Sequence, residues 1–160
     1  MKKYFTALVA SLLLIGCSST QPPEQFPDLP LTEAELLTPK WQGLQRYEAR
    51  YPIEDARAGN DGCATIEYVI TPDYQITAIQ TIDSTGRHFA RQAREAIQRM
   101  DLTQIAPATL TEPVKTRTRF EFCIENNEGD CDESRLQQER QCRGTDALFS
   151  VGFMVKRLGP

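Results

Sequence analysis

Four cysteines beyond the N-terminal region, Cys63, Cys123, Cys131 and Cys142, are the residues best suited to covalent or metal chemistry. Thiolates bind zinc when two of them are separated by only two to four residues, and no pair here has that spacing. An even number of cysteines instead predicts two disulfides, and hence an oxidising compartment. The absence of a C-x-x-C motif predicts that these disulfides are structural rather than redox-active.

The remaining polar residues form no recognisable catalytic set. The single histidine, His88, follows Gly86-Arg87 at the start of a predicted helix, which favours a surface or cap role. The aspartates near loops are scattered, at Asp55, Asp61, Asp73 and Asp83. The acidic stretch 126–133 lacks the residue order of a calcium loop, so a solvated loop is the better interpretation. The sequence therefore predicts no enzyme, no metal site and no cofactor.

The N-terminus has the pattern of an export signal. Lys2 and Lys3 precede an apolar run from Phe5 to Leu14, and Leu14-Ile15-Gly16-Cys17 resembles the lipobox of bacterial lipoproteins. That resemblance implies that residues 1–16 are a signal peptide, that Cys17 is acylated with palmitate as the new N-terminus, and that Ser18 directs the protein to the outer membrane rather than the inner one. The alternative is a fortuitous cysteine in an ordinary signal peptide.

Charge and composition narrow the remaining classes. Removal of residues 1–16 takes away two of the 18 basic residues and no acidic residue. The remaining chain has 16 basic and 22 acidic residues, a net charge of −6, which argues against nucleic-acid binding. Residues 17–31 comprise the lipidated cysteine and a flexible tether, and the stretch 18–30 spans at most about 45 Å. We expect residues 32–160 to form one domain.

Hydrophobic periodicity predicts an α+β fold. Thr32 to Glu35 resembles a capping box for a short helix, and Pro39 begins a second short helix that carries Trp41, Leu44 and Tyr47. Strands are expected over 63–70 and 75–82, joined by a turn at 71–74, and over 114–123. Between the last two strands lies an amphipathic helix with an apolar stripe of Phe89, Ala93, Ala96, Ile97 and Met100.

These elements predict a small antiparallel sheet of ββαβ order packed against one main helix. The third strand would pair with the first in a register whose residue numbers sum to about 186, by the alternation of both strands. This places Cys63 opposite Cys123 on a solvent-side face, and Glu67 opposite Arg119. Cys131 then pairs with Cys142 by elimination and encloses a short helix within 132–141. Three pairings are open to four cysteines, so this one depends on the register.

A run of features from about Tyr51 to Glu125 resembles the C-terminal domain of TonB. The features are Tyr51-Pro52, Ala56, Gly59, Gly62, the turn Thr71-Pro72-Asp73, Ser84, Ala93, Ala96, Pro107-Ala108 and Pro113-Val114. The resemblance implies a non-enzymatic periplasmic module that adds a short peptide of an outer-membrane receptor as a strand beside the third strand. The implied binding edge comprises Val114, Lys115, Thr116, Arg117, Thr118, Arg119 and Phe120, continues to Phe122, and has Tyr51 and Pro52 nearby.

Under this resemblance Lys115, Arg117 and Arg119 would attract an acidic peptide; the alternative is that they form a solvated strand face. The chain departs from energy transducers of the family, because it has a lipid signal instead of a transmembrane helix and lacks a long Pro-rich spacer. Further on, Phe149, Val151, Phe153 and Val155 alternate with smaller or polar residues, which predicts a fourth strand.

Two functions therefore remain open. In the first, an envelope or outer-membrane protein segment binds by strand pairing, with a connection to TonB-linked transport. In the second, the protein is a structural envelope lipoprotein whose fourth strand closes the sheet edge and whose helical surface, or the face around Trp41, contacts a neighbour. The first requires a displaced tail and the second a fixed one. Exchange of the tail strand between chains would give a homodimer.

Overall fold

The structure, a computed structural model, describes residue 26 and residues 28–106, 109–126, 131–138 and 141–154. The predicted signal peptide and Cys17 lie outside these residues. The elements are two 3₁₀ turns, η1 (Glu35–Leu37) and η2 (Pro39–Trp41), the helices α1 (Ile53–Ala58), α2 (Arg87–Gln98) and α3 (Glu133–Gln138), and the strands β1 (Gly62–Ile70), β2 (Ile76–Ser84), β3 (Val114–Glu125) and β4 (Ala147–Phe153). Within the described residues, the helices are too short or too polar to span a membrane.

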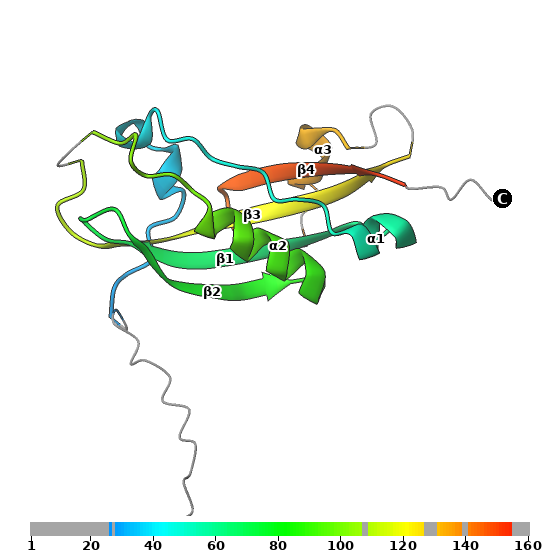
Figure 1. Cartoon of the computed structure of the whole chain (residues 1–160), viewed down its shortest axis with the longest axis horizontal. Coiled ribbons are helices and arrows are strands. Elements are labelled where there is room, and N and C mark those ends of the chain that lie inside the picture. The colour runs from blue at the N-terminus through cyan, green and yellow to red at the C-terminus, as the bar shows by residue number, and fades with distance from the viewer. Residues whose placement is uncertain (1–25, 27, 107–108, 127–130, 139–140, 155–160) are drawn as a thin grey trace, which may run out of the picture.

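The predicted α+β fold is confirmed, with one change in the sheet. The strand order is β2-β1-β3-β4, as Figure 1 shows. β1 pairs antiparallel with β2 and with β3, but β4 runs parallel to β3, so the sheet is mixed rather than antiparallel. A parallel neighbour requires a crossover connection. Here the chain returns through α3 and the residues after it before β4 begins.

The helix α2 packs on the sheet as its apolar stripe predicts. Phe89, Ala93, Ala96 and Ile97 are buried, and they meet the β1 residues Ala64, Ile66, Tyr68 and Ile70 in the core. Figure 1 shows α2 in front of β1 and β2, and the segment 42–52 crossing in front of β3 and β4. One face of the sheet is therefore covered by α2 together with this segment.

The N-terminal helices are shorter than predicted. Thr32 does not cap a helix; its backbone N–H donates to the Lys115 carbonyl of β3 at 2.8 Å. The second predicted helix is only η2, after which the chain is extended, so Leu44 and Tyr47 share no helical face. The dipeptide Tyr51-Pro52 precedes α1 rather than ending a helix, because Pro52 occupies its N-cap position.

The predicted register between β1 and β3 is wrong by two residues. Paired residue numbers sum to about 184, which sets Cys63 opposite Glu121 and Glu67 opposite Arg117. Ile66 lies opposite Thr118 rather than Phe120. A shift of two residues leaves every side chain on its predicted face, because the side-chain period of a strand is two. The core was therefore predicted correctly while the partners across the ladder were not.

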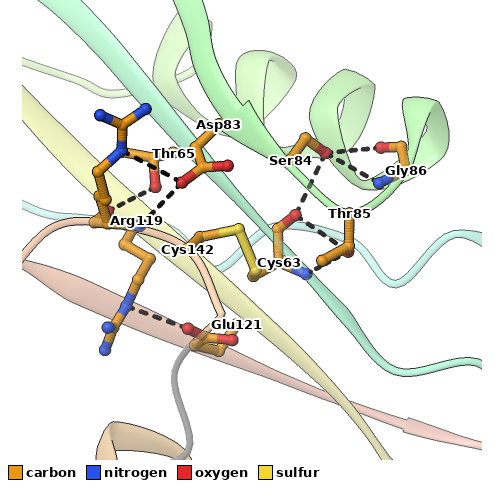
Figure 2. The surroundings of a disulfide bond; sticks show 10 residues. Cys63, Thr65, Asp83, Ser84, Thr85, Gly86, Arg119, Glu121 and Cys142 are labelled. Atoms are coloured by element: carbon orange, nitrogen blue, oxygen red, sulfur yellow. Dashed lines mark hydrogen bonds and ion pairs between the residues drawn. A yellow bond between two sulfur atoms is a disulfide. The ribbon is translucent and has the colours of Figure 1, made fainter.

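The register changes the disulfides. Cys63 pairs with Cys142, and Cys123 pairs with Cys131, so the expected pairs Cys63–Cys123 and Cys131–Cys142 are incorrect. The Cα atoms of Cys123, in β3, and Cys131 lie 5.6 Å apart. Cys142, which precedes β4, is bonded to Cys63 near the start of β1, as Figure 2 shows.

The face of the sheet away from α2, which was predicted to face solvent, is partly covered. Cys63 and Thr65 are almost fully buried there. The Thr65 hydroxyl donates to the Arg143 carbonyl at 2.6 Å, which holds the segment before β4 against β1. The predicted short helix in this region is confirmed as α3. The crossover that creates the parallel strand thus also covers part of this face.

Candidate functional site

The outer edge of β3, where the resemblance places peptide binding, is covered in its first half by the N-terminal segment. Leu31 forms a parallel bridge with Lys115. The Thr116 hydroxyl donates to the Thr32 carbonyl at 2.9 Å. Arg117 forms an ion pair with Glu33. Residues that precede the sheet in the sequence therefore occupy the positions at which an external strand would begin to pair.

The second half of the same edge is covered by β4. Seven consecutive pairs join the strands, from Arg119 with Ala147 to Glu125 with Phe153. Just before β4, the Asp146 carbonyl accepts a hydrogen bond from the Arg119 N–H at 2.8 Å. The tail strand predicted from the sequence therefore lies on the edge that the resemblance assigns to a peptide. An added strand can pair with this part of β3 only if β4 leaves.

A buried polar cluster fixes the start of β4. The Asp146 carboxylate accepts from Arg46 Nη2 at 2.7 Å and from the Thr118 hydroxyl at 2.9 Å. The Tyr68 hydroxyl lies 2.9 Å from that of Thr118. Burial raises the pKa of Tyr68, so its hydroxyl is protonated at neutral pH. The cluster joins β1, β3, β4 and the segment before α1, and we call these four residues the Asp146 clamp.

The middle of β4 is fixed from the α2 side of the sheet. The Ser150 hydroxyl donates to the Ala49 carbonyl at 2.8 Å. Gly152 lies beneath the Tyr51 ring so closely that a Cβ atom there would be 2.6 Å from a ring carbon. Tyr51 also makes an edge-on contact with Phe122, with ring centroids 5.7 Å apart. Tyr51, predicted to lie near a peptide, therefore holds the tail strand.

The predicted cationic stripe is not a free binding surface. Arg119 is 1% exposed, and its Nε lies 3.1 Å from Glu121 Oε1 in an ion pair near the Cys63–Cys142 disulfide, as Figure 2 shows. Arg117 is paired with Glu33, and Lys115 is half-buried. Attraction of an acidic peptide by three exposed cations is therefore not supported. The face around Trp41, predicted as an alternative contact surface, is not exposed at Trp41 itself. Trp41 is buried, and its indole N–H donates to Glu35.

Burial raises the pKa of Glu121 to about 7, although Arg119 partly offsets this effect. In the unfolded chain the carboxyl titrates near 4.5, so between the two values the folded state binds more protons. The stability contributed by protonated Glu121 is complete below pH 4.5 and is lost as the pH rises through about 7.

Glu121→Gln should reduce this loss of stability, measured as the free energy of unfolding in urea at about pH 5 and about pH 8. The matched control is Glu95→Gln on the exposed face of α2, which should leave the pH dependence unchanged. An equal pH dependence in Glu121→Gln and the parent protein would show that Glu121 is not responsible.

Of the residues that sequence reasoning singled out for chemistry, His88 and Asp55 lie in contact. His88 Nδ1 lies 3.0 Å from Asp55 Oδ2, which ties the start of α2 to α1. Among the described residues, no group of three or more histidine, cysteine and acidic side chains could hold a metal ion. Sequence reasoning missed the Asp146 clamp, since Arg46 and Asp146 are 100 residues apart. Gly152 within a strand was the available signal of a close backbone approach.

Comparison with known proteins shows which family the central part of the chain resembles. Residues 47–124 match the sequence model described as the Gram-negative bacterial TonB protein C-terminal. The solution NMR structure of the Pseudomonas aeruginosa TonB CTD aligns with 22% identity and a TM-score of 0.42, covering 54% of this chain and 91% of that chain. No match was found among curated proteins.

TonB C-terminal domains mediate protein–protein interactions, and the mixed sheet with its helices gives this chain the α+β class. More particularly, the chain contains a TonB C-terminal-like domain. β4 lies beyond the matched residues, so the strand that covers β3 is outside the part of the chain that matches.

Proposed function

We propose that this protein is a lipid-anchored interaction module on the periplasmic face of the outer membrane. The lipobox ending at Cys17 and the following Ser18 support this location. The tether of residues 17–31 would keep the domain close to its own membrane, since residues 18–30 reach at most about 45 Å. The membrane is one partner, through the lipid. The other is a segment or surface of an envelope or outer-membrane protein.

The pairing of the β3 edge by β4 is the observation that supports the proposed mode of binding. Four separate ties hold the tail: the Cys63–Cys142 disulfide, the Asp146 clamp, the Ser150–Ala49 hydrogen bond and the packing of Gly152 on Tyr51. Peptide binding at β3 would require the last three of these contacts to break, while the disulfide would still hold the segment before β4 at β1. The geometry therefore favours the second function inferred from the sequence, a non-enzymatic envelope lipoprotein whose own chain closes this edge and which binds its protein partner elsewhere.

Photo-crosslinking in cells tests this proposal. A photoreactive residue in place of Arg117 should react within the same chain, near Glu33, because that segment lies on the β3 edge. Truncation after Gly144 removes β4 and should destabilise the protein. Capture of an outer-membrane receptor by the full chain, strengthened by truncation, would contradict the closed edge and restore peptide gripping in TonB-linked transport.

Cys17→Ser should release the protein from the membrane fraction, because it removes the acylation site. We expect the parent protein to incorporate labelled palmitate and to sediment with outer membranes, whereas the variant incorporates none and remains in the soluble periplasmic fraction. Ser18→Asp is the matched control, since it keeps the lipid and should move the protein to the inner membrane. Retention of Cys17→Ser in the outer membrane would show that the lipid is not the anchor.

A further inference from the structure

The two outer edges of the sheet are built differently. β2 pairs with β1 through two register shifts, and Ala78 within it has a positive φ of 49°. The Ile79 carbonyl of β2 accepts from Arg94 of α2 at 2.9 Å. Irregular pairing and covering side chains are devices by which natural sheets prevent further strands from adding to an edge. The β2 edge is thus protected.

The β4 edge carries none of these devices in its described residues. Its seven residues pair with β3 without a register shift and include no charged residue and no proline. Phe149 is half-buried, whereas Val151 is 45% exposed and Phe153 is 68% exposed. These three alternate residues share one side of the strand, and we call them the β4 stripe. A regular, apolar edge of this kind readily pairs with another strand.

The stripe lies on the side of the sheet away from α2. The register places Phe149, Val151 and Phe153 beside Glu121, Cys123 and Glu125 of β3. On the opposite side, Ser150 and Gly152 are covered by Ala49 and Tyr51. Phe149, Val151 and Phe153 therefore point outward. Ser150 and Gly152 point inward, on the side where Leu148 packs against the core, because the space above them is already filled. An added strand would meet both the backbone edge and the stripe.

The charged residues around the β4 stripe indicate which side chains a bound segment can carry. Glu125 is the β3 neighbour of Phe153, and Asp132 and Glu133 follow Cys131, which is bonded to Cys123. Glu121, the neighbour of Phe149, is already paired with Arg119. An acidic side chain placed beside Phe153 would meet these carboxylates and lose hydration. Aliphatic or aromatic side chains at alternate positions would instead cover Val151 and Phe153.

We infer that the outer edge of β4 is the partner-binding site, and that it takes an extended protein segment with large apolar residues at alternate positions and no acidic residues. This inference rests on the proposed interaction function and names the strand and the partner chemistry. It differs from binding of an acidic peptide at β3 in both respects. One edge of β4 then pairs with β3, and its other edge binds the partner.

Peptide binding to the oxidised mature chain tests the inference. The probe is a fluorescent nine-residue peptide in which valine and phenylalanine alternate with serine and threonine between terminal lysines. One control peptide has the same composition with its apolar residues consecutive, and another has glutamate in place of each apolar residue. Anisotropy should show binding of the alternating peptide and at least tenfold weaker binding of both controls. Amide NMR shifts should centre on residues 147–153.

Val151→Lys should weaken binding of the alternating peptide at least tenfold, because it places a charge in the stripe. Thr81→Lys is the matched control: it introduces the same charge at an exposed position of the other edge strand, β2, and should leave binding unchanged. Circular dichroism and thermal melting verify that both variants fold. Equal binding by Val151→Lys, or NMR shifts centred elsewhere, would overturn the inference.

Two further measurements separate this inference from the proposed function. Sedimentation of the parent protein should show a monomer, and a dimer abolished by Val151→Lys would overturn the assignment in favour of a second copy on β4. In cells, formaldehyde should crosslink the parent protein to a partner and crosslink Val151→Lys much less. A partner retained by Val151→Lys overturns the inference but leaves the proposed function intact, whereas no partner for either protein overturns both.

Discussion

Replacement of both Cys63 and Cys142 by alanine is expected to lower the free energy of unfolding by about 4 to 5 kcal/mol. The disulfide closes a loop between residues separated by 79 positions, and long loops lose most conformational entropy when they are crosslinked in the unfolded chain. It also ties the segment before β4 to the start of β1. We therefore expect the tail to be less protected from amide hydrogen exchange in the double variant.

The second disulfide provides the matched comparison. Cys123 and Cys131 are separated by only 8 positions, so replacing both by alanine should cost about 2 to 3 kcal/mol. Urea unfolding of the two double variants under oxidising conditions measures the difference. Equal losses would show that closure of the long loop is not what stabilises the domain. A stable Cys63/Cys142 variant with an unprotected β4 would show that the disulfide serves only the tail.

Asp146→Ala should destabilise the domain by about 3 kcal/mol. The Asp146 side chain is fully buried, and its removal leaves the Arg46 guanidinium, itself only 14% exposed, without its carboxylate. It also takes the acceptor from the Thr118 hydroxyl. An unpaired buried charge costs more than the intact pair contributes, so the loss should exceed that expected for a surface ion pair.

Asp83→Ala is the control for Asp146→Ala. Asp83 pairs with Arg143 at 3.5 Å on an exposed part of the surface, where we expect a loss below about 1 kcal/mol. If the Asp146 clamp acts as a unit, Arg46→Ala in the Asp146→Ala background should cost little more. A loss below about 1 kcal/mol for Asp146→Ala itself would show that the clamp positions β4 without stabilising the fold.

The β3 edge of this domain is already paired within its own chain. A sheet edge whose N–H and C=O groups are already paired cannot accept another strand. Here residues from both ends of the domain do the covering, Leu31 and Thr32 on one half of β3 and β4 on the other. We expect a partner strand to pair with β4 instead of β3, because the backbone groups of the β4 edge and the β4 stripe are both available.

The sequence by itself determined the strands, the main helix and which of their side chains share a face. Alternation predicted the strands, and a 3.6-residue period predicted α2 and its buried stripe, because these patterns are properties of neighbouring residues. The same local logic indicated a fourth strand from the alternation that includes Phe149, Val151 and Phe153. It also indicated two disulfides, since four cysteines in an exported chain have few other outcomes.

Only the tertiary structure decided which elements meet and in what register. A two-residue slip between β1 and β3 keeps the same faces, so no hydrophobic pattern can distinguish Cys63 opposite Glu121 from Cys63 opposite Cys123. The direction of β4 depends on the path of the crossover, which also sets the disulfide pairing. Asp146 and Arg46 lie 100 residues apart, and nothing local to either predicts their contact. The apolar side of β4 faces outward because Ala49 and Tyr51 already fill the space on its inner side.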